Sequence, residues 1–345
     1  MTRALVIGAN GQIGSELVHA LCELHGEHNV FAADLVAPGQ ALPVTFETVD
    51  VLDVPRLQSV VSRHRVDEVY QLAAVLSAKG EAAPLATWNL NMNALTNVLE
   101  LAREQRIGRI FWPSSIAAFG PHSMPSDTPQ LAVMDPQTIY GISKLAGERL
   151  CDYYHLRFGV DVRSLRFPGV VSYRTRPGGG TTDYAIAIFQ AARRHEPYTC
   201  FLGPDTRLPM IYMPDAIRAT IELMGADARR VRVRSSYNVA GMSFTPREIA
   251  DAIRRHVPDF GICYQPDFRQ VIAESWPQSI DDSQAGRDWG WQSGFDLEAM
   301  VVDMLENMPL DWADPGDTLF PAVSRGAQPR VESAPPIGRA SGIPR

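Results

Sequence analysis

A tyrosine and a lysine four residues apart could act as an acid–base pair. Tyr140 and Lys144 stand in the segment YGISK, and this spacing places both side chains on one face of a helix. A tyrosine with its ordinary pKa of about 10 is a poor base at neutral pH, and lowering that pKa by three units requires about 4 kcal/mol. A nearby ammonium supplies such stabilisation. The chain has only two lysines among its 32 lysine and arginine residues, so the spacing is informative, although an exposed helix pair is the alternative.

Two serines precede this pair at the end of an expected strand. Ser114 and Ser115 close the segment WPSS, and open α/β sheets bind ligands at the carboxyl ends of their strands. A hydroxyl there could hydrogen-bond a reacting alcohol or carbonyl oxygen, whereas the structural alternative is that it caps a turn. The order of strand end, tyrosine and lysine favours a catalytic interpretation.

Glycines near the N-terminus predict a dinucleotide site. Gly8, Gly11 and Gly14 form GxxGxxG between a short apolar segment and a helical pattern. Glycine lets the backbone approach a pyrophosphate, and the helix N-terminus offers free N–H groups. Asp34 closes the next expected strand, where a carboxylate accepts hydrogen bonds from ribose hydroxyls and repels a 2′-phosphate. No arginine follows Asp34, which favours NAD over NADP; a glycine turn with a surface aspartate is the alternative.

Further cofactor contacts are expected where the following strands end. Asp50 could meet the adenine amino group, although a plain turn aspartate fits the sequence equally well. Ala73 and Ala74 would let a cofactor pass close to the backbone, although small residues are common at strand ends. The expected cofactor-binding residues are Gly8, Asn10, Gly11, Gln12, Ile13, Gly14, Asp34, Asp50, Val51, Leu72, Ala73, Ala74, Asn91, Tyr140, Lys144 and Phe167.

The order of elements predicts a Rossmann-type α/β fold. Short apolar segments alternate with helical patterns in the first half of the chain, which is typical of a doubly wound parallel sheet covered on both faces. We expect an NAD-binding domain over residues 1–168 with a returning segment near 215–240. A smaller, interleaved α/β substrate-binding domain is expected over 169–312. Residues 313–345 are rich in Pro, Gly, Ser and Arg and are expected to be disordered.

Composition limits the classes of function. The net charge of −7 provides no basic surface for nucleic acid, and no apolar run is long enough to cross a membrane. The N-terminal segment reaches its glycines too early for a secretory signal, so a cytoplasmic protein is expected. The four cysteines form no CxxC pair, and His25, Glu27 and His28 beside Gly26 suit an exposed helix end better than a metal site. No metal is therefore expected.

A glycine-rich loop in the second half could bind a small polar ligand. The segment RPGGGTTDYA covers residues 176–185 and precedes an apolar helical pattern. Glycine amides and the hydroxyls of Thr181 and Thr182 could donate to a carboxylate, and Asp183 could accept from an ammonium. The same three residues are good helix N-caps, so the residues alone leave both interpretations open.

Together these residues resemble the extended short-chain dehydrogenase/reductase superfamily. The resemblance rests on GxxGxxG, a strand-end serine and YxxxK, and it covers about residues 1–310. It implies that Tyr140 is the general acid–base and that Lys144 binds the nicotinamide ribose and lowers the pKa of Tyr140. It further implies that Ser115 orients the substrate oxygen and that Asn91 supports a proton relay.

Within the superfamily, the chain resembles the short-chain L-threonine 3-dehydrogenases. The likeness is carried by LAAVLSAKGE, WPSSIAAFGP, YGISKLAGE, RFPGVVSYRTRPGGGTTDYAIAIF, TRLPMIYMPDA and ESWPQSIDDSQAGRDWGW. It implies a metal-independent oxidation of the L-threonine β-hydroxyl by NAD, which yields 2-amino-3-oxobutyrate. The implied substrate contacts are Ser77, Ser115, Tyr140, Gly178, Thr181, Thr182, Asp183 and Trp276.

A nucleotide-sugar 4-epimerase of the same superfamily is the main alternative. Most extended members act on nucleotide sugars, but Pro168 stands here where those enzymes resemble one another in an asparagine. Ile116 and Ala117 replace the Asp-Glu pair of the dehydratases, so dehydration lacks its acid. A non-catalytic NAD-binding regulator is the third interpretation, although such proteins often lose the tyrosine or lysine that this chain keeps.

The resemblance also implies partners. The small-molecule partner would be L-threonine. The two long helices expected near 84–106 and 137–158 are similar to those that pair into a four-helix dimer interface in the superfamily, so a homodimer is expected.

Overall fold

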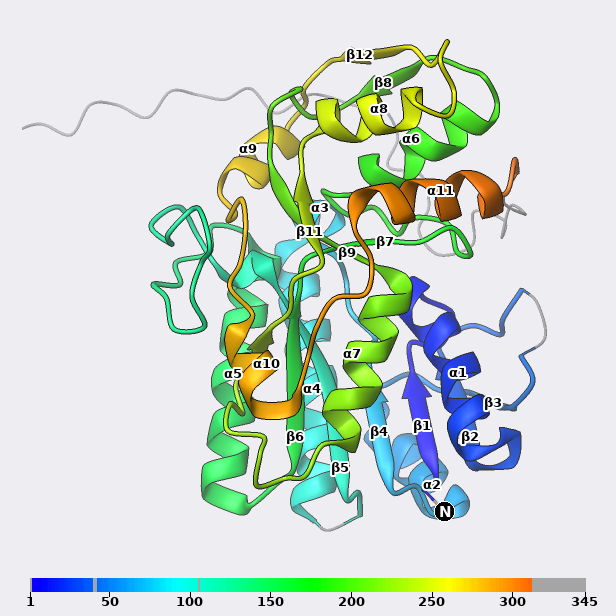
Figure 1. Ribbon diagram of the computed structural model, residues 1–345. Helices are drawn as coiled ribbons and strands as arrows, with labels where there is room; N and C mark the ends of the chain where they lie inside the picture. The colour runs from blue at the N-terminus through cyan, green and yellow to red at the C-terminus, as the bar shows by residue number, and fades with distance from the viewer. Residues whose placement is uncertain (1, 40–41, 105, 312–345) are drawn as a thin grey trace, which may run out of the picture. The chain divides into compact units, whose positions relative to one another are not determined.

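A seven-stranded parallel sheet forms the lower part of the molecule in Figure 1. In spatial order its strands are β10 (Tyr237–Asn238), β6 (Val162–Phe167), β5 (Arg109–Ser115), β4 (Glu68–Gln71), β1 (Ala4–Ile7), β2 (Val30–Asp34) and β3 (Thr45–Thr48). From β1 the chain adds β2 and β3 on one side, and then β4, β5 and β6 on the other, so the order of strand addition reverses between β1 and β4. Such a switch point is where open α/β sheets bind ligands.

The computed structural model describes residues 2–39, 42–104 and 106–311. The tail at 313–345, which was expected to be disordered, lies outside the described residues. The other ranges belong to one compact unit, Met1–Trp312. A division into two domains at residue 168 stays a prediction, because this unit contains both parts.

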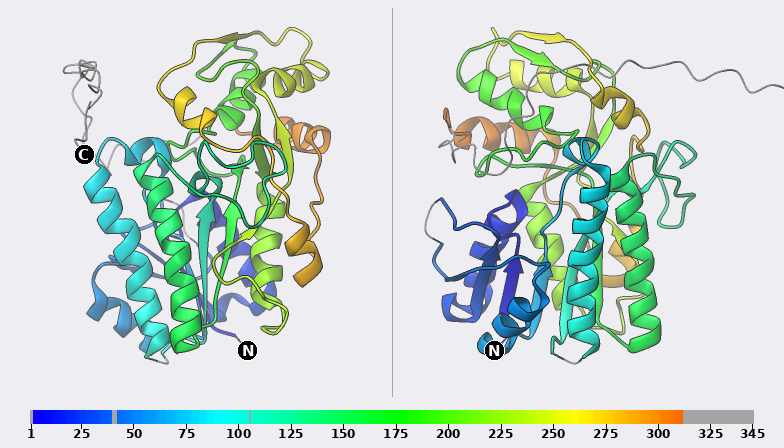
Figure 2. Two further views of the ribbon diagram at one scale, coloured as in Figure 1. Left: turned by 90° about the vertical axis from the view of Figure 1, so that its left-hand side faces the viewer. Right: turned by 180° about the vertical axis from the view of Figure 1, so that it is seen from behind.

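Both faces of the large sheet are buried, which confirms the expected doubly wound α/β fold. Ala4 and Val6 of β1 contribute to the core on one face, and the alternate residues Leu5 and Ile7 contribute to the core on the other. Five helices cover these faces: α1 (Gln12–His25) and α7 (Met213–Gly225) lie on one, and α2 (Val54–His64), α4 (Pro84–Arg103) and α5 (Ile139–Phe158) lie on the other (Figure 2).

A smaller group of elements covers the carboxyl end of the sheet. It contains a three-stranded sheet, β11 (Met242–Phe244), β9 (Leu208–Tyr212) and β7 (Gly169–Val171), and a two-stranded sheet, β12 (Ile262–Tyr264) and β8 (Tyr198–Cys200). Its helices are α6 (Tyr184–Arg193), α8 (Pro246–Arg254), α9 (Arg269–Glu274) and α11 (Leu297–Asn307), whereas α10 (Ser283–Trp289) packs back on the large sheet. We call this group the cap.

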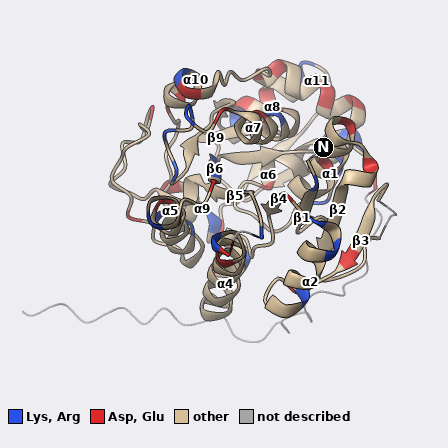
Figure 3. Cartoon of the chain, turned by 90° about the horizontal axis from the view of Figure 1, so that it is seen from below, with Lys and Arg blue, Asp and Glu red and all other residues tan. Residues whose placement is uncertain are grey.

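Charged residues of both signs lie on the outer helices when the molecule is seen from below (Figure 3). None of the helices in the described ranges combines the length and the apolar character needed to cross a bilayer.

A buried ion pair ties helix α5 to the large sheet. Arg166 of β6 donates from Nε to Oε1 of Glu148 at 2.8 Å and from Nη2 to Oε2 at 2.7 Å. Ser114 of β5 donates to Oε1 of Glu148 at 2.6 Å, and a third Arg166 nitrogen donates to Asn238 of β10 at 3.0 Å. Glu148 is 0% exposed and Arg166 1% exposed. A buried pair of this kind is tolerated only when its remaining polar atoms are also bonded, as they are here.

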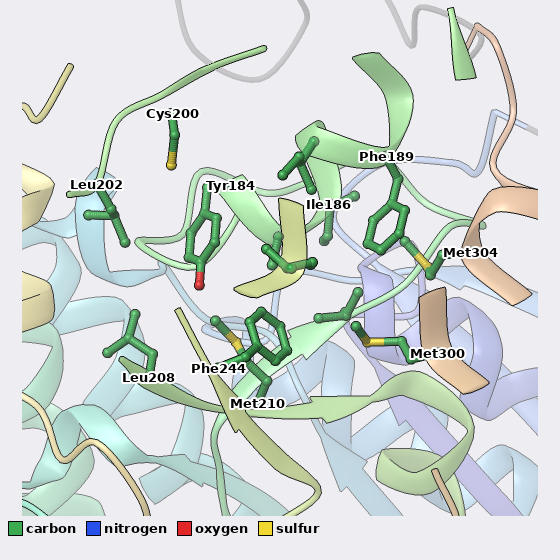
Figure 4. Close-up of a cluster of buried hydrophobic side chains, with 14 of the residues drawn as sticks. Tyr184, Ile186, Phe189, Cys200, Leu202, Leu208, Met210, Phe244, Met300 and Met304 are labelled. Atoms are coloured by element: carbon green, nitrogen blue, oxygen red, sulfur yellow. The ribbon is translucent and has the colours of Figure 1, made fainter. Parts of the chain in front are cut away.

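The core of the cap contains one polar atom without a partner. Figure 4 shows Tyr184, the first residue of α6, among Leu202, Leu208, Met210 and Phe244. Tyr184 is fully buried, and its hydroxyl has no hydrogen-bond partner within the described part of the chain. A buried hydroxyl that lost its water without gaining a partner is a cost to the folded state.

Replacing Tyr184 by phenylalanine is expected to leave the free energy of unfolding unchanged or to raise it by about 1 kcal/mol, because it removes only the unpaired hydroxyl. The measurement is urea unfolding followed by circular dichroism. Tyr212→Phe is the matched control, since Tyr212 is equally buried but donates to Asp303, and it is expected to lower the stability by about 1–2 kcal/mol. An equal loss of stability in both variants would contradict the finding that the Tyr184 hydroxyl has no partner.

Candidate active site

The turn between β1 and α1 is so close to its neighbours that it requires glycine. Gly8 has a φ of +84°, and a Cβ there would lie 2.7 Å from the backbone nitrogen of Ala73. A Cβ on Gly14 would collide with the carbonyl oxygen of Gly8. Gly11 is the N-cap of α1 and has no side chain to occupy the first helical amides. We call residues 8–14 the glycine cradle, and its free amides suit an anionic group.

Asp34 is oriented by the rim of this cradle. Its carboxylate accepts from the Asn10 amide nitrogen at 2.9 Å and from the Leu35 amide nitrogen at 2.7 Å. The side chain of Asn10 donates to the Val36 carbonyl at 2.7 Å, which leaves its Oδ1 buried and without a partner among the described residues. A cradle with glycine at its three closest positions, an orphaned acceptor and a fixed carboxylate together fit a dinucleotide such as NAD.

The other expected cofactor residues lie along the same edge of the sheet. Because the strands are parallel, positions that close β6 or follow β3 and β4 share the edge at which α1 begins. Asp50 follows β3 but has the contacts of a turn aspartate: it is exposed and accepts from the Leu52 amide at 2.9 Å. The remaining candidates on this edge are Gln12, Ile13, Val51, Leu72, Ala73, Ala74 and Phe167.

Helix α5 brings Tyr140 against the end of β5. Thr138 caps the helix by accepting from the Gly141 amide at 3.1 Å, and a Cβ on Gly141 would collide with the carbonyl oxygen of Ala117. This close approach places Tyr140 beside Ser115, the N-cap of the short 3₁₀ helix η2 (Ile116–Ala118). Burial raises the pKa of Tyr140 to about 12, and a hydrogen bond with Ser115 opposes that rise.

Ser115 caps a turn, which is one of the two alternatives that the sequence left open, and its contact with a reacting oxygen stays a prediction. Its Oγ accepts from the Ala117 amide at 3.2 Å, which caps η2, and the same side chain hydrogen-bonds Tyr140. The hydroxyl therefore stands next to the phenol, where it could also contact a reacting oxygen.

Lys144 lies one helical turn beyond Tyr140 and is also buried. Its Nζ donates to the Pro113 carbonyl at 2.6 Å and lies 4.6 Å from the centre of the Trp112 ring and 5.4 Å from that of the Tyr140 ring. Burial lowers the pKa of Lys144 to about 7. Lys144 was expected to lower the pKa of Tyr140. In the protein without ligands the pKa of Tyr140 is instead raised, because burial favours the neutral form of both residues.

Two expected catalytic residues have structural contacts. The hydroxyl of Ser114, expected to be catalytic, donates to Glu148 of the buried ion pair, because consecutive residues of a strand point to opposite faces. Asn91 of α4 bonds both backbone polar groups of Val75, at 2.9 and 3.2 Å, and donates to Ser143 at 3.3 Å. Asn91 thus joins the loop after β4 to α5.

The glycine-rich loop is closed by its own residues. The Asp183 carboxylate accepts from the amides of Gly179 and Gly180, both at 2.8 Å, and makes no capping hydrogen bond to α6. The hydroxyl of Thr181 lies 3.1 Å from that of Ser77, at the start of the short helix α3 (Ser77–Gly80), and both residues are buried. Asp183 is therefore the N-cap residue of α6 without a capping side chain, and its role as an acceptor for a substrate ammonium stays a prediction.

The rest of the loop packs between α3 and the cap. Gly178 lies against Leu76, and the methyl group of Thr182 lies against Gly169. Trp276 follows α9 and lines a surface hollow of the cap together with residues such as Arg207 and Gln278. The loop thus places Gly178 near the start of α3 and Thr182 against β7, while Trp276 lies at the cap.

Sequence reasoning missed two features of the site. Glu148 is four residues beyond Lys144, so the same helical spacing that singled out Tyr140 and Lys144 could have indicated it. The stem of Lys79 lies across Gly179, which has a φ of +93° and no room for a Cβ. The rarity of lysine in this chain was the available signal for Lys79. Within the described residues, no group of three or more His, Cys, Asp or Glu side chains is placed to hold a metal ion.

Comparison with known proteins gives consistent matches. Residues 4–240 match the model of the NAD-dependent epimerase/dehydratase family. An uncharacterised epimerase/dehydratase of Staphylococcus haemolyticus is 44% identical over 310 residues, which cover 89% of this chain and 97% of that protein. The holo form of the GalE-like L-threonine dehydrogenase from Cupriavidus necator is 58% identical, with a TM-score of 0.88 and coverage of 89% and 100%. The L-threonine dehydrogenase of Clostridium difficile is 45% identical, with a TM-score of 0.87 and coverage of 89% and 98%.

Replacing Asp34 by alanine is expected to weaken NADH binding about tenfold or more and to reduce the preference over NADPH, because a charge-assisted hydrogen bond and a like-charge repulsion are both lost. The measurement is titration of nucleotide fluorescence. Asp50→Ala is the control: its carboxylate serves a turn, so binding is expected to change less than about twofold. Equal effects of the two substitutions would contradict a specific role of Asp34.

Proposed function

Because the chain belongs to the NAD-dependent epimerase/dehydratase family, we propose that it is an NAD-dependent L-threonine 3-dehydrogenase. The proposal rests chiefly on one observation: Ser115, Tyr140 and Lys144 meet at the same carboxyl edge of the sheet as the glycine cradle, in a chain 58% identical to an L-threonine dehydrogenase over 89% of its length. The reaction would oxidise the β-hydroxyl of L-threonine and yield 2-amino-3-oxobutyrate.

The glycine cradle and Asp34 would hold NAD. The free amides at the start of α1 face a pyrophosphate, and Asp34 accepts from ribose hydroxyls. Lys144 would donate to the second ribose with the N–H groups that do not bind Pro113. When bound, NAD supplies the acceptor for the hydride that leaves the β-carbon.

Tyr140 would receive the proton of the β-hydroxyl, and Ser115 would orient that oxygen. Tyr140 and Lys144 together lose their first proton near neutral pH, since burial lowers the pKa of Lys144 to about 7 and raises that of Tyr140 to about 12. The pair that lacks one proton can take one from the substrate. In its phenolate–ammonium form, that proton goes to Oη of Tyr140.

The glycine-rich loop would close over the amino acid. Its shape is held internally by the bonds of Asp183 and by the Ser77–Thr181 contact. We therefore assign the hydroxyl of Thr182 and the amide of Gly178, rather than the bonded groups, as the loop's donors to the substrate carboxylate. Trp276 would contact the substrate from the cap.

The proposal is tested by following NADH formation with the purified full chain, L-threonine and NAD. UDP-glucose and UDP-galactose are run in parallel, and the assay is repeated with a chelator. Turnover of L-threonine that survives the chelator is expected. Tyr140→Phe is expected to lower kcat by about 10²–10⁴-fold, because it removes the proton acceptor. Conversion of a nucleotide sugar without turnover of threonine would instead identify an epimerase.

The rate is expected to depend on pH through the Tyr140–Lys144 pair. Below about pH 7 the pair holds both protons and cannot accept another, so kcat/KM should fall about tenfold per pH unit on the acid side. Above about pH 7 one proton is lost and the rate should reach a plateau. The measurement is kcat/KM for L-threonine from pH 5 to 9. A flat profile down to pH 5.5 would rule out this assignment.

We also propose that two copies pair through α4 and α5. The two helices pack side by side (Figure 2), and they expose Leu85 to 73% and Leu156 to 83%. Pairing would bury these side chains, which suit an interface better than water. Light scattering during size exclusion would settle the proposal, and a monomer at micromolar concentration would reject it.

A further inference from the structure

Helix α5 presents a third buried residue on the face that carries Tyr140 and Lys144. Glu148 follows Lys144 by four residues, as Lys144 follows Tyr140, so all three side chains lie along one face. All three are buried by the sheet. The proposed reaction uses the first two residues and assigns no part to the carboxylate.

Two successive residues of β5 are attached to this face. The carbonyl of Pro113 accepts from Nζ of Lys144 at 2.6 Å, and the next residue, Ser114, donates to Glu148 at 2.6 Å. Arg166 of β6 holds the same carboxylate with two nitrogens. Glu148 therefore fixes the strand segment that contains the only backbone acceptor shown for Lys144 among the described residues.

Two groups of α5 favour the ammonium of Lys144 by their charge, Cys151 with the larger effect and Glu148 with the smaller. From α5, Lys144 faces Tyr140, Glu148 and Cys151; from β5 it faces the Trp112 ring and the Pro113 carbonyl. Burial raises the pKa of the Cys151 thiol, which keeps it neutral. Burial disfavours the ammonium of Lys144, and the Glu148 charge opposes that effect.

The charges around Glu148 come from two elements. Arg166 faces it from β6, and Arg149 of α5 approaches its Oε2 at 3.9 Å from the exposed side. Within this ion pair, the charge of Glu148 is the one that raises the pKa of Lys144.

We infer that Glu148 is a positioning residue of the active site: held by Ser114 and Arg166, it fixes the strand segment that accepts from Lys144 and favours the ammonium form of that lysine beside Tyr140. The inference rests on the proposed function for the roles of Tyr140 and Lys144. Its own claim concerns the charge of one lysine, which can be measured without any substrate.

The composition of the chain allows a direct test. Only Lys79 and Lys144 occur in all 345 residues, so protein grown with lysine labelled with ¹³C at Cε shows two lysine signals. The variant Lys79→Arg assigns them. Titration of the full chain is expected to give a midpoint near 7 for Lys144.

Glu148→Gln keeps an acceptor for Ser114 but removes the charge, and it is expected to lower the Lys144 midpoint by about one pH unit. Because this change leaves Arg166 buried and unpaired, the double variant Glu148→Gln, Arg166→Met removes both charges and keeps the test open if the single variant does not fold. The double variant is expected to show the same direction of shift.

Asp161→Asn is the matched control. Asp161 pairs with Arg163, which is fully buried at the other end of β6, at 2.9 and 3.0 Å. Its loss is expected to lower the melting temperature without moving the Lys144 midpoint. If the Glu148 variants likewise lose stability while the midpoint stays within about 0.2 pH unit of the parent, Glu148 is merely structural and the inference is overturned. Absence of threonine turnover would reject the proposed function and leave this result unaffected.

Discussion

The ion pair of Glu148 and Arg166 joins the elements that carry Ser115, Tyr140 and Lys144. Glu148 belongs to the helix of Tyr140 and Lys144, and Arg166 belongs to the neighbouring strand β6. Ser114 connects the pair to the strand that ends in Ser115. Because a buried charge is stable only with its partners in place, these three elements can pack in essentially one way. The positions of the phenol and the ammonium follow from that packing.

The glycine cradle and the glycine-rich loop hold their shapes by different interactions. The glycine cradle depends on steric exclusion, since Gly8 and Gly14 have no space for a side chain. The glycine-rich loop depends on internal hydrogen bonds, with Asp183 holding two amides and Thr181 bonded to Ser77. Ahead of this loop, Thr175 contacts Ser15 of α1 at 2.9 Å. The same stretch of chain therefore touches the cofactor helix and encloses the proposed substrate region.

Burial determines the electrostatics of the proposed acid–base pair. It raises the pKa of Tyr140 and lowers that of Lys144, so within the chain both groups tend toward neutrality. Ser115 and Glu148 act in the opposite sense, the first on Tyr140 and the second on Lys144. Within the chain alone, the pair that lacks one proton therefore keeps the remaining proton mainly on Tyr140, and any group that favours the Lys144 ammonium shifts the pair toward its phenolate–ammonium form.

Local patterns in the sequence determined much of this protein. Apolar runs and glycines predicted the parallel sheet and the cradle, and the spacing of Tyr140 and Lys144 predicted their common face, because such features depend on neighbouring residues alone. Tertiary structure decided which polar groups bond one another. Ser114 and Ser115 are adjacent and chemically identical, yet the strand directs one to Glu148 and the other to Tyr140. Asp183 likewise binds loop amides rather than its helix. Such partners come from distant segments or from loop geometry, and spacing along the chain does not encode them.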